Sequence, residues 1–230
     1  MLIYAGIDEA GYGPMLGPLC VACTVFAVEP RESDAHPGAP DLWKRLNNVI
    51  SKAGKSGSGT SSRRAAKGRI LIDDSKKLKG PRDGRMHPLK HLERGVLSFL
   101  ASITDRPQAS PNSNGVAHSE HSEERVLPRT DAELMQWVGC NHTSHPWWQN
   151  DVELPLGATE GELRIDAARL AHSLQESGVT MHAICCEAID AGSFNDQVDR
   201  MGTKAGVNWC SAMRLADEIM QRWGDHHPRI

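Results

Sequence analysis

Apolar residues gather near the start of the chain in two short runs that have the composition of β-strands. Residues 2–7 form the first run, which ends at Asp8 and Glu9, and residues 19–28 form the second, rich in Val, Cys, Thr and Phe. Both patterns predict buried strands. The glycines and prolines between the runs predict a tight turn, and this connection is too short for a crossover helix. We therefore expect the two strands to pair antiparallel.

Farther along the chain, apolar residues recur at helical spacing or alternate as they do in a strand. Gly178 would end one helix, and Ser193 with Asp196 forms a capping pair for the last one, whose apolar stripe places Trp209 in the core. Residues 229–230 have the character of the start of another element. The predicted ranges are 41–50, 87–103, 163–177 and 195–223 for helices and 179–187 for a strand.

Two stretches are polar and carry few apolar residues. Residues 51–69 hold several basic residues among Gly and Ser and no acid, which is typical of a mobile segment. Residues 105–130 are rich in Pro, Ser, Asn and His, and we expect residues 105–160 to form an insertion or a mobile region, because so long a plain connection is uncommon. The remaining strands and helices indicate a single α/β domain over residues 1–230.

Composition narrows the class of protein. The chain has 26 Lys and Arg against 29 Asp and Glu, a net charge of −3, which disfavours binding nucleic acid by bulk charge alone but leaves local basic patches open. Its apolar runs are too short for a transmembrane helix, and its N-terminus lacks the basic region of a signal peptide. The adjacent Cys185 and Cys186 argue against a disulfide framework, and Cys20 and Cys23 read as small strand residues on opposite faces. We therefore expect a cytoplasmic protein without a membrane partner.

The adjacent acids Asp8 and Glu9 are the strongest chemical signal. Two acids at the end of an apolar strand are costly to bury unless they are paired or bound to a metal, and oxygen ligands suit Mg²⁺ or Mn²⁺. Neighbouring strand residues point to opposite faces, so both acids serve one site only if the strand bends or ends there. Gly11 and Gly13 would permit that bend. The alternative is a hydrophilic turn after a strand.

Three motifs of this chain resemble those of type 2 ribonuclease H (ribonuclease HII). The first is the stretch 6–18, in which a strand ends in Asp-Glu and is followed by Gly-Tyr-Gly-Pro and then Gly-Pro. The second is Asp-Ser-Lys-Lys-Leu at 74–78. The third, Glu-Ala-Ile-Asp at 187–190 followed by Asn195, is similar to that family's Glu-Ile-Asp-x-x-Asn segment but less closely. The motifs occur in the order that the family has.

The resemblance implies a ribonuclease H-like fold, in which helices flank a mixed sheet, and a divalent-metal site that uses Mg²⁺ or Mn²⁺. It also implies an endonuclease that hydrolyses the RNA strand of RNA–DNA hybrids, or ribonucleotides embedded in DNA. By position, Asp8 and Glu9 match catalytic metal ligands. Substrate-binding roles fall to the turn that reads the ribose and to groups that contact the nucleic-acid backbone, namely Gly11, Tyr12, Gly13, Ser75 and Lys76.

Two departures from the family pattern affect this interpretation. Tyr12 replaces the arginine usual between the two glycines, so a cationic contact to phosphate is missing there. The family's third and fourth metal carboxylates follow the long C-terminal helix, and this chain ends at Ile230 where that strand would start. We therefore expect either a domain that is incomplete at its C-terminal end or a catalytically incomplete relative that binds nucleic acid. A third hypothesis is an interaction protein whose insertion binds a partner.

Overall fold

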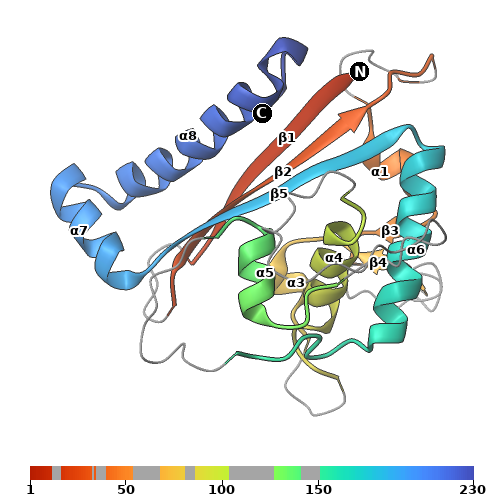
Figure 1. Ribbon diagram of the computed structural model, residues 1–230, viewed down its shortest axis with the longest axis horizontal. Helices are drawn as coiled ribbons and strands as arrows, with labels where there is room; N and C mark the ends of the chain where they lie inside the picture. Colours follow the sequence, from red (N-terminus) through yellow and green to blue (C-terminus); the bar gives the residue numbers. More distant parts are fainter. Residues whose placement is uncertain are drawn as a thin grey trace, which may run out of the picture.

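The computed structural model describes residues 1–11, 17–32, 34, 40–53, 68–80, 86–103, 127–140 and 151–230. Helices lie on both faces of a small sheet, so the molecule is mixed α/β as the apolar pattern predicts (Figure 1). The strands are β1 (Leu2–Ala10), β2 (Leu19–Val28), β3 (Ile50–Ser51), β4 (Ile70–Leu71) and β5 (Val179–Ile189). The helices are α1 (Leu42–Arg45), α3 (Ser75–Leu78), α4 (Lys90–Leu100), α5 (Asp131–Trp137), α6 (Glu160–Glu176), α7 (Ala191–Met201) and α8 (Lys204–Trp223), with a 3₁₀ turn η2 (Gly224–His226).

The main sheet has the strand order β1-β2-β5, and both neighbouring pairs are antiparallel. The predicted pairing of the first two strands is therefore confirmed. Arg229 adds a parallel bridge to the free edge of β1, where its amide donates to the Ile3 carbonyl at 2.9 Å and its carbonyl accepts from the Ala5 amide at 2.8 Å. The bridge is a single residue pair, and the start of another element at residues 229–230 stays a prediction. A second, two-stranded parallel sheet joins β3 to β4.

The main sheet lies between two parts of the hydrophobic core, one on each of its faces. On one side, odd-numbered residues of β1 and β2 pack with the inner face of α8. On the other side, Tyr4 and Phe26 pack toward α4 and α6, which Figure 1 shows on the opposite face of the sheet from α8. β2 has a strand on each edge, and its odd-numbered residues, together with Val28, are buried.

The predicted helix over 195–223 is wrong, because the chain forms two helices there. Gly202 ends α7 in the left-handed conformation with a φ of 76°, and Thr203 caps α8 by accepting from the Gly206 amide. The predicted capping pair is also wrong, since Asp190 caps α7. The break shifts the helical phase, so Trp209 is 64% exposed instead of in the core. The inner face of α8 carries Val207, Ser211, Leu215 and Ile219.

The other predicted elements differ mainly in their ends. The helix predicted over 41–50 shortens to α1, because a turn follows it and Ile50 begins β3. Within the predicted insertion 105–160, residues 127–140 and 151–160 pack against the rest of the fold, and its other residues lie outside the described ranges. The same holds for residues 54–67 of the predicted mobile segment. In the described part of the chain, no helix has the length and apolar character needed to cross a membrane.

Candidate functional site

Asp8 and Glu9 lie exposed near the end of β1, but they point to opposite faces of the sheet. β1 stays in regular register with β2 through Ala10, which is opposite Cys20, so the strand neither bends nor ends at the two acids. Odd-numbered residues of β1, such as Ile7, pack on the side of α8. Alternation along the strand therefore places Glu9 on the side of α8 and Asp8 on the side of α4 to α6. The two carboxylates would share one site only if β1 bent or ended at them, and it does neither.

The side of α8 carries a second glutamate near Glu9. Val21 is opposite Glu9 on one edge and opposite Glu187 on the other, so the three residues form one row across the sheet. With strands about 4.8 Å apart, the two glutamate Cα atoms lie about 10 Å apart. Arg214 of α8 reaches Glu187, with 2.5 Å between its Nη2 and Oε1, and it also donates to the Ser211 hydroxyl at 2.9 Å.

The motifs in the sequence did not predict the Glu187–Arg214 ion pair. Glu187 belongs to the third motif, which suggested no role for it, and Arg214 is 27 positions away on a different element. No local spacing links the two residues, because their contact depends on how α8 crosses the sheet. The pair neutralises the carboxylate that lies nearest to Glu9 in this row.

Asp8 has no second acid in its own row. Its Oδ1 accepts the Glu9 amide at 2.9 Å, a local bond within the strand. Across the sheet the row continues through Ala22 to Cys186, so a thiol stands where Glu187 stands on the opposite face. Asp8 is exposed, and within the described residues it forms no ion pair.

The turn after β1 requires glycine at Gly11. Its φ is +80°, and a Cβ at this position would lie 2.6 Å from the carbonyl oxygen of Pro18, closer than such atoms approach. The structure therefore gives a steric reason for the first glycine of the motif. Tyr12 and Gly13 lie outside the described residues.

Ser75 and Lys76 begin α3 and are both exposed. Asp74 caps this short helix, and its Oδ1 accepts the Lys76 amide at 2.8 Å. Lys77 has its own partner, because its Nζ lies 2.8 Å from Oδ1 of Asp73 and lowers the pKa of that carboxyl. Lys76 has no ion-pair partner among the described residues. Its ammonium group is thus available to an external anion.

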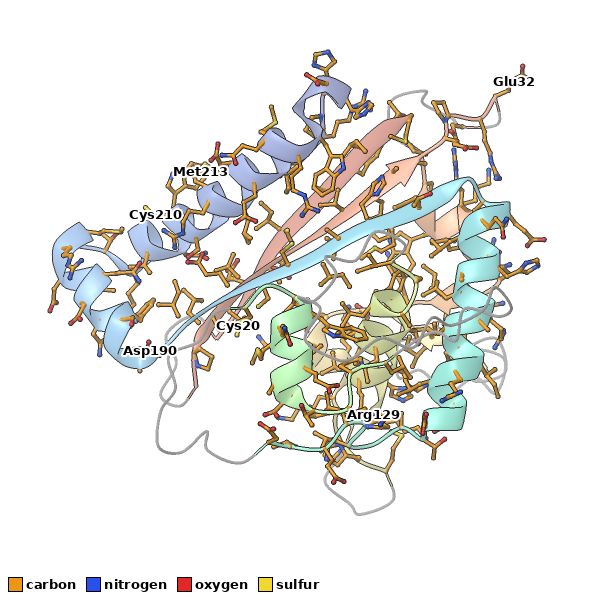
Figure 2. All side chains as sticks on the ribbon, viewed as in Figure 1. Cys20, Glu32, Arg129, Asp190, Cys210 and Met213 are labelled. Atoms are coloured by element: carbon orange, nitrogen blue, oxygen red, sulfur yellow. The ribbon has the colours of Figure 1, made fainter. Side chains whose placement is uncertain are left out.

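The third motif has a structural role at Asp190. Figure 2 shows this residue where β5 ends and α7 begins. Its Oδ1 accepts the amides of Gly192 at 2.9 Å and Ser193 at 3.0 Å, and its Oδ2 accepts the Ser193 hydroxyl at 2.6 Å. These bonds satisfy the first amides of the helix, so helix capping accounts for this acid.

A pocket of about 430 Å³ lies away from these motifs in sequence. Arg129, labelled in Figure 2, lines it together with Glu160 and Arg164 at the start of α6. Glu160 and Arg164 pair with each other at 2.7 Å, as neighbours one turn apart on a helix commonly do. None of the site residues predicted from the motifs is among the residues that line this pocket.

The described residues contain no group of three or more His, Cys, Asp or Glu side chains arranged to hold a metal ion. The two predicted ligands therefore stand as separate carboxylates on opposite faces of the sheet. No family model, no curated protein and no solved structure matches the chain.

Proposed function

We propose that the protein is a ribonuclease H-type endonuclease that hydrolyses the RNA strand of RNA–DNA hybrids or ribonucleotides embedded in DNA. The observation that carries this proposal is the end of β1. There the exposed acids Asp8 and Glu9 are followed, after Ala10, by Gly11, and this position accepts only glycine for steric reasons. A backbone without side chain at that point would let a ribose approach main-chain amides closely, and the 2′-hydroxyl distinguishes RNA from DNA.

The arrangement of the sheet supports a ribonuclease H-like fold as part of the proposal. Three antiparallel strands carry helices on both faces, and Arg229 runs parallel to β1 on its free edge. A mixed sheet flanked by helices is what the resemblance implies. Fold alone does not assign chemistry, so the proposal depends on the residues at the end of β1 and in α3.

A divalent cation, Mg²⁺ or Mn²⁺, would supply activation of a water molecule and stabilisation of the leaving oxygen. Asp8 and Glu9 offer oxygen atoms to such a cation, but two carboxylates on opposite faces do not complete a site for it. We therefore assign no reaction step to the cation. In this proposal Gly11 positions the ribose, while Ser75 and Lys76 bind the phosphate backbone.

The separation of the two acids favours a second candidate function, a relative that binds nucleic acid without cutting it. Such a protein would use the same exposed residues, Lys76 and Ser75 among them, to bind the backbone. The absence of a three-ligand group within the described ranges is the specific observation behind this alternative.

A cleavage assay separates the two candidates. Labelled duplexes would carry a single ribonucleotide in DNA, an RNA–DNA hybrid or DNA alone, each with Mg²⁺, Mn²⁺ or a chelator. We expect cleavage only where RNA is present, its loss in Asp8→Asn and in Glu9→Gln, and its retention in Asp225→Asn. Asp225 is the matched control because it is an exposed acid in η2, outside the motifs.

Fluorescence anisotropy on the same duplexes gives the second readout. Salt-sensitive binding without cleavage would overturn the endonuclease and support the binding protein, because phosphate contacts release counterions. An absence of both cleavage and binding would overturn both candidates. Cleavage at the wild-type rate in Asp8→Asn would contradict the role of that residue.

A further inference from the structure

Four of the six cysteines lie on β2 and β5, Cys140 lies beside Cys186 of β5, and all six are free thiols. Cys23 and Cys185 are on the side of the sheet that faces α8, where both pack in the core. Cys20 and Cys186 point to the opposite side, where Cys186 packs against the end of α5. The two neighbouring strands therefore hold one thiol pair on each face of the sheet.

The register of β2 and β5 distinguishes the two pairs. Cys23 is directly opposite Cys185, and their thiols share a hydrogen bond. Directly opposed residues of antiparallel strands have Cα atoms about 4.5 to 5.5 Å apart, which lies within the range that a disulfide spans. The register therefore places Cys23 and Cys185 at a Cα separation that a disulfide can span.

The second pair is diagonal. Cys20 is opposite Ala188, and Cys186 is opposite Ala22, so the two cysteines are offset by two residues. Their thiols also share a hydrogen bond, but diagonal neighbours have Cα atoms about 7 to 8 Å apart. That separation exceeds what a disulfide bridges without a shift of the strands.

Each pair contains one thiol whose pKa is lowered by its partner. The hydrogen bond from Cys23 lowers the pKa of Cys185 to about 7, and the positive charge of Arg222 acts in the same direction. The hydrogen bond from Cys186 likewise lowers the pKa of Cys20 to about 7. Cys20 and Cys185 are both partly exposed, so each can present a nucleophilic thiolate to a small molecule. Cys23 is only 2% exposed and would act after its partner.

We propose that Cys185 and Cys23 form a peroxide-reactive dithiol that closes into a disulfide between β5 and β2. The Cys185 thiolate attacks one oxygen of hydrogen peroxide, the O–O bond breaks, and the departing hydroxide takes a proton to become water. The Cys23 sulfur then attacks the Cys185 sulfenic acid. The S–S bond forms as the S–O bond breaks, and the hydroxide leaves as water with the Cys23 proton. Two thiols and one peroxide thus give one disulfide and two waters.

Peptide mapping of the full chain tests this proposal. The reduced protein is treated with hydrogen peroxide, remaining thiols are alkylated, and the unreduced digest is analysed by mass spectrometry. We expect a linked pair of peptides that carry Cys23 and Cys185, lighter than the two reduced peptides by two hydrogen atoms. The link should disappear after treatment with dithiothreitol and should be absent from Cys185→Ser. It should persist in Cys20→Ser, the matched control.

Three results would overturn the proposal. One is a wild-type protein in which both thiols survive peroxide. Another is Cys185 oxidised to sulfinic acid without any link to Cys23. The third is a link between Cys20 and Cys186 in place of the expected one. Cys20 and Cys23 fall on one peptide, and the adjacent Cys185 and Cys186 fall on another. Fragmentation of the linked pair from the wild-type protein therefore decides which cysteines are joined, so poor folding of a serine variant leaves the test intact. The readout involves no nucleic acid, and its result is independent of the proposed nuclease function.

Discussion

At the scale of single residues, neighbouring side chains of one motif differ in what they can bind. Lys77 is held by Asp73, whose carboxylate raises the pKa of the ammonium group. Lys76 is equally exposed on the same helix and has no ion-pair partner among the described residues. The sequence of the motif alone does not make this distinction, because both positions are lysine.

We expect Lys76→Gln to weaken nucleic-acid binding and Lys77→Gln to leave it nearly unchanged. Loss of one phosphate contact should reduce the slope of log K against log salt by about 1 and should act on all sequences alike. Anisotropy titrations of a hybrid duplex at several salt concentrations provide the measurement. Equal effects of the two variants would contradict the assignment of Lys76.

A second contrast at this scale concerns a buried ion pair between α4 and α6. Arg94 donates from Nε to Oδ2 of Asp166 at 2.7 Å, and Asp166 is only 3% exposed. Burying a carboxylate is unfavourable unless a cation stays beside it, so the pair acts as a unit. The pair lies between these two helices, on the face of the main sheet opposite α8.

Removal of one partner of the Arg94–Asp166 pair should lower the free energy of unfolding much more than replacement of both partners. We expect Arg94→Met to lower the free energy of unfolding by about 3 kcal/mol, because Asp166 is left buried without a cation. The double variant Arg94→Met/Asp166→Leu should regain most of that loss. Urea unfolding followed by circular dichroism measures both values, and equal losses in the two variants would refute the interpretation.

At the scale of elements, the break between α7 and α8 shows where sequence patterns stop being sufficient. Apolar residues continue at helical spacing across Gly202, so periodicity predicts one helix. The left-handed conformation at Gly202 and the Thr203 cap interrupt it, and the phase of the stripe changes. Glycine is a common residue just after a helix end, and threonine is a common N-cap residue, so Gly202-Thr203 marks one helix ending and the next beginning. Here this local signal places the helix boundary more reliably than the apolar periodicity does.

Two glycine substitutions should have opposite signs. Gly202→Ala is expected to destabilise the fold by about 1 kcal/mol, because the position has a positive φ although nothing crowds it. Gly161→Ala, in the first turn of α6 with open space around it, should stabilise the fold by about 0.5 kcal/mol. Denaturant midpoints of the two variants measured side by side test the pair. A stabilising Gly202→Ala would contradict the left-handed cap.

At the scale of the whole molecule, the sequence predicts the sheet better than the site. Alternation and the short turn suffice for the antiparallel pair β1–β2, because both are local properties. The order of β5 and the crossing of α8 depend on distant contacts, so the Glu187–Arg214 pair could not be read from spacing. Whether Asp8 and Glu9 share a site depends on where β1 ends, and glycines permit a bend without requiring it.

The contact between α4 and α6 also links global stability to pH. The Lys90 ammonium, followed by the Thr159 amide, lowers the pKa of Glu162 to about 2 from its usual 4.5. Because the pKa is depressed in the folded state, this stabilisation is present above about pH 4.5 and is lost as the pH falls toward 2. The Glu162 carboxylate lies 2.9 Å from Nζ of Lys90.

We therefore expect Glu162→Gln to be less stable than the wild type at neutral pH and to lose less stability between about pH 5 and pH 2. Lys90→Met should flatten the same part of the curve, because it removes the largest cause of the shift. Urea unfolding at a series of pH values gives the comparison. A variant curve parallel to that of the wild type would show that Glu162 does not contribute to the acid sensitivity.

The central position of β2 has a consequence for how the molecule opens. Its amides bond to strands on both edges. On one face α8 packs against its buried odd-numbered side chains, and on the other face Phe26 and Val28 pack in the core cluster that includes residues of α4 and α6. No fraying of a single element exposes this strand to water, so its backbone hydrogens should exchange with deuterium only through nearly complete unfolding. The slowest-exchanging hydrogens of the chain are therefore expected within Leu19–Val28, and their rates would report the global free energy of unfolding.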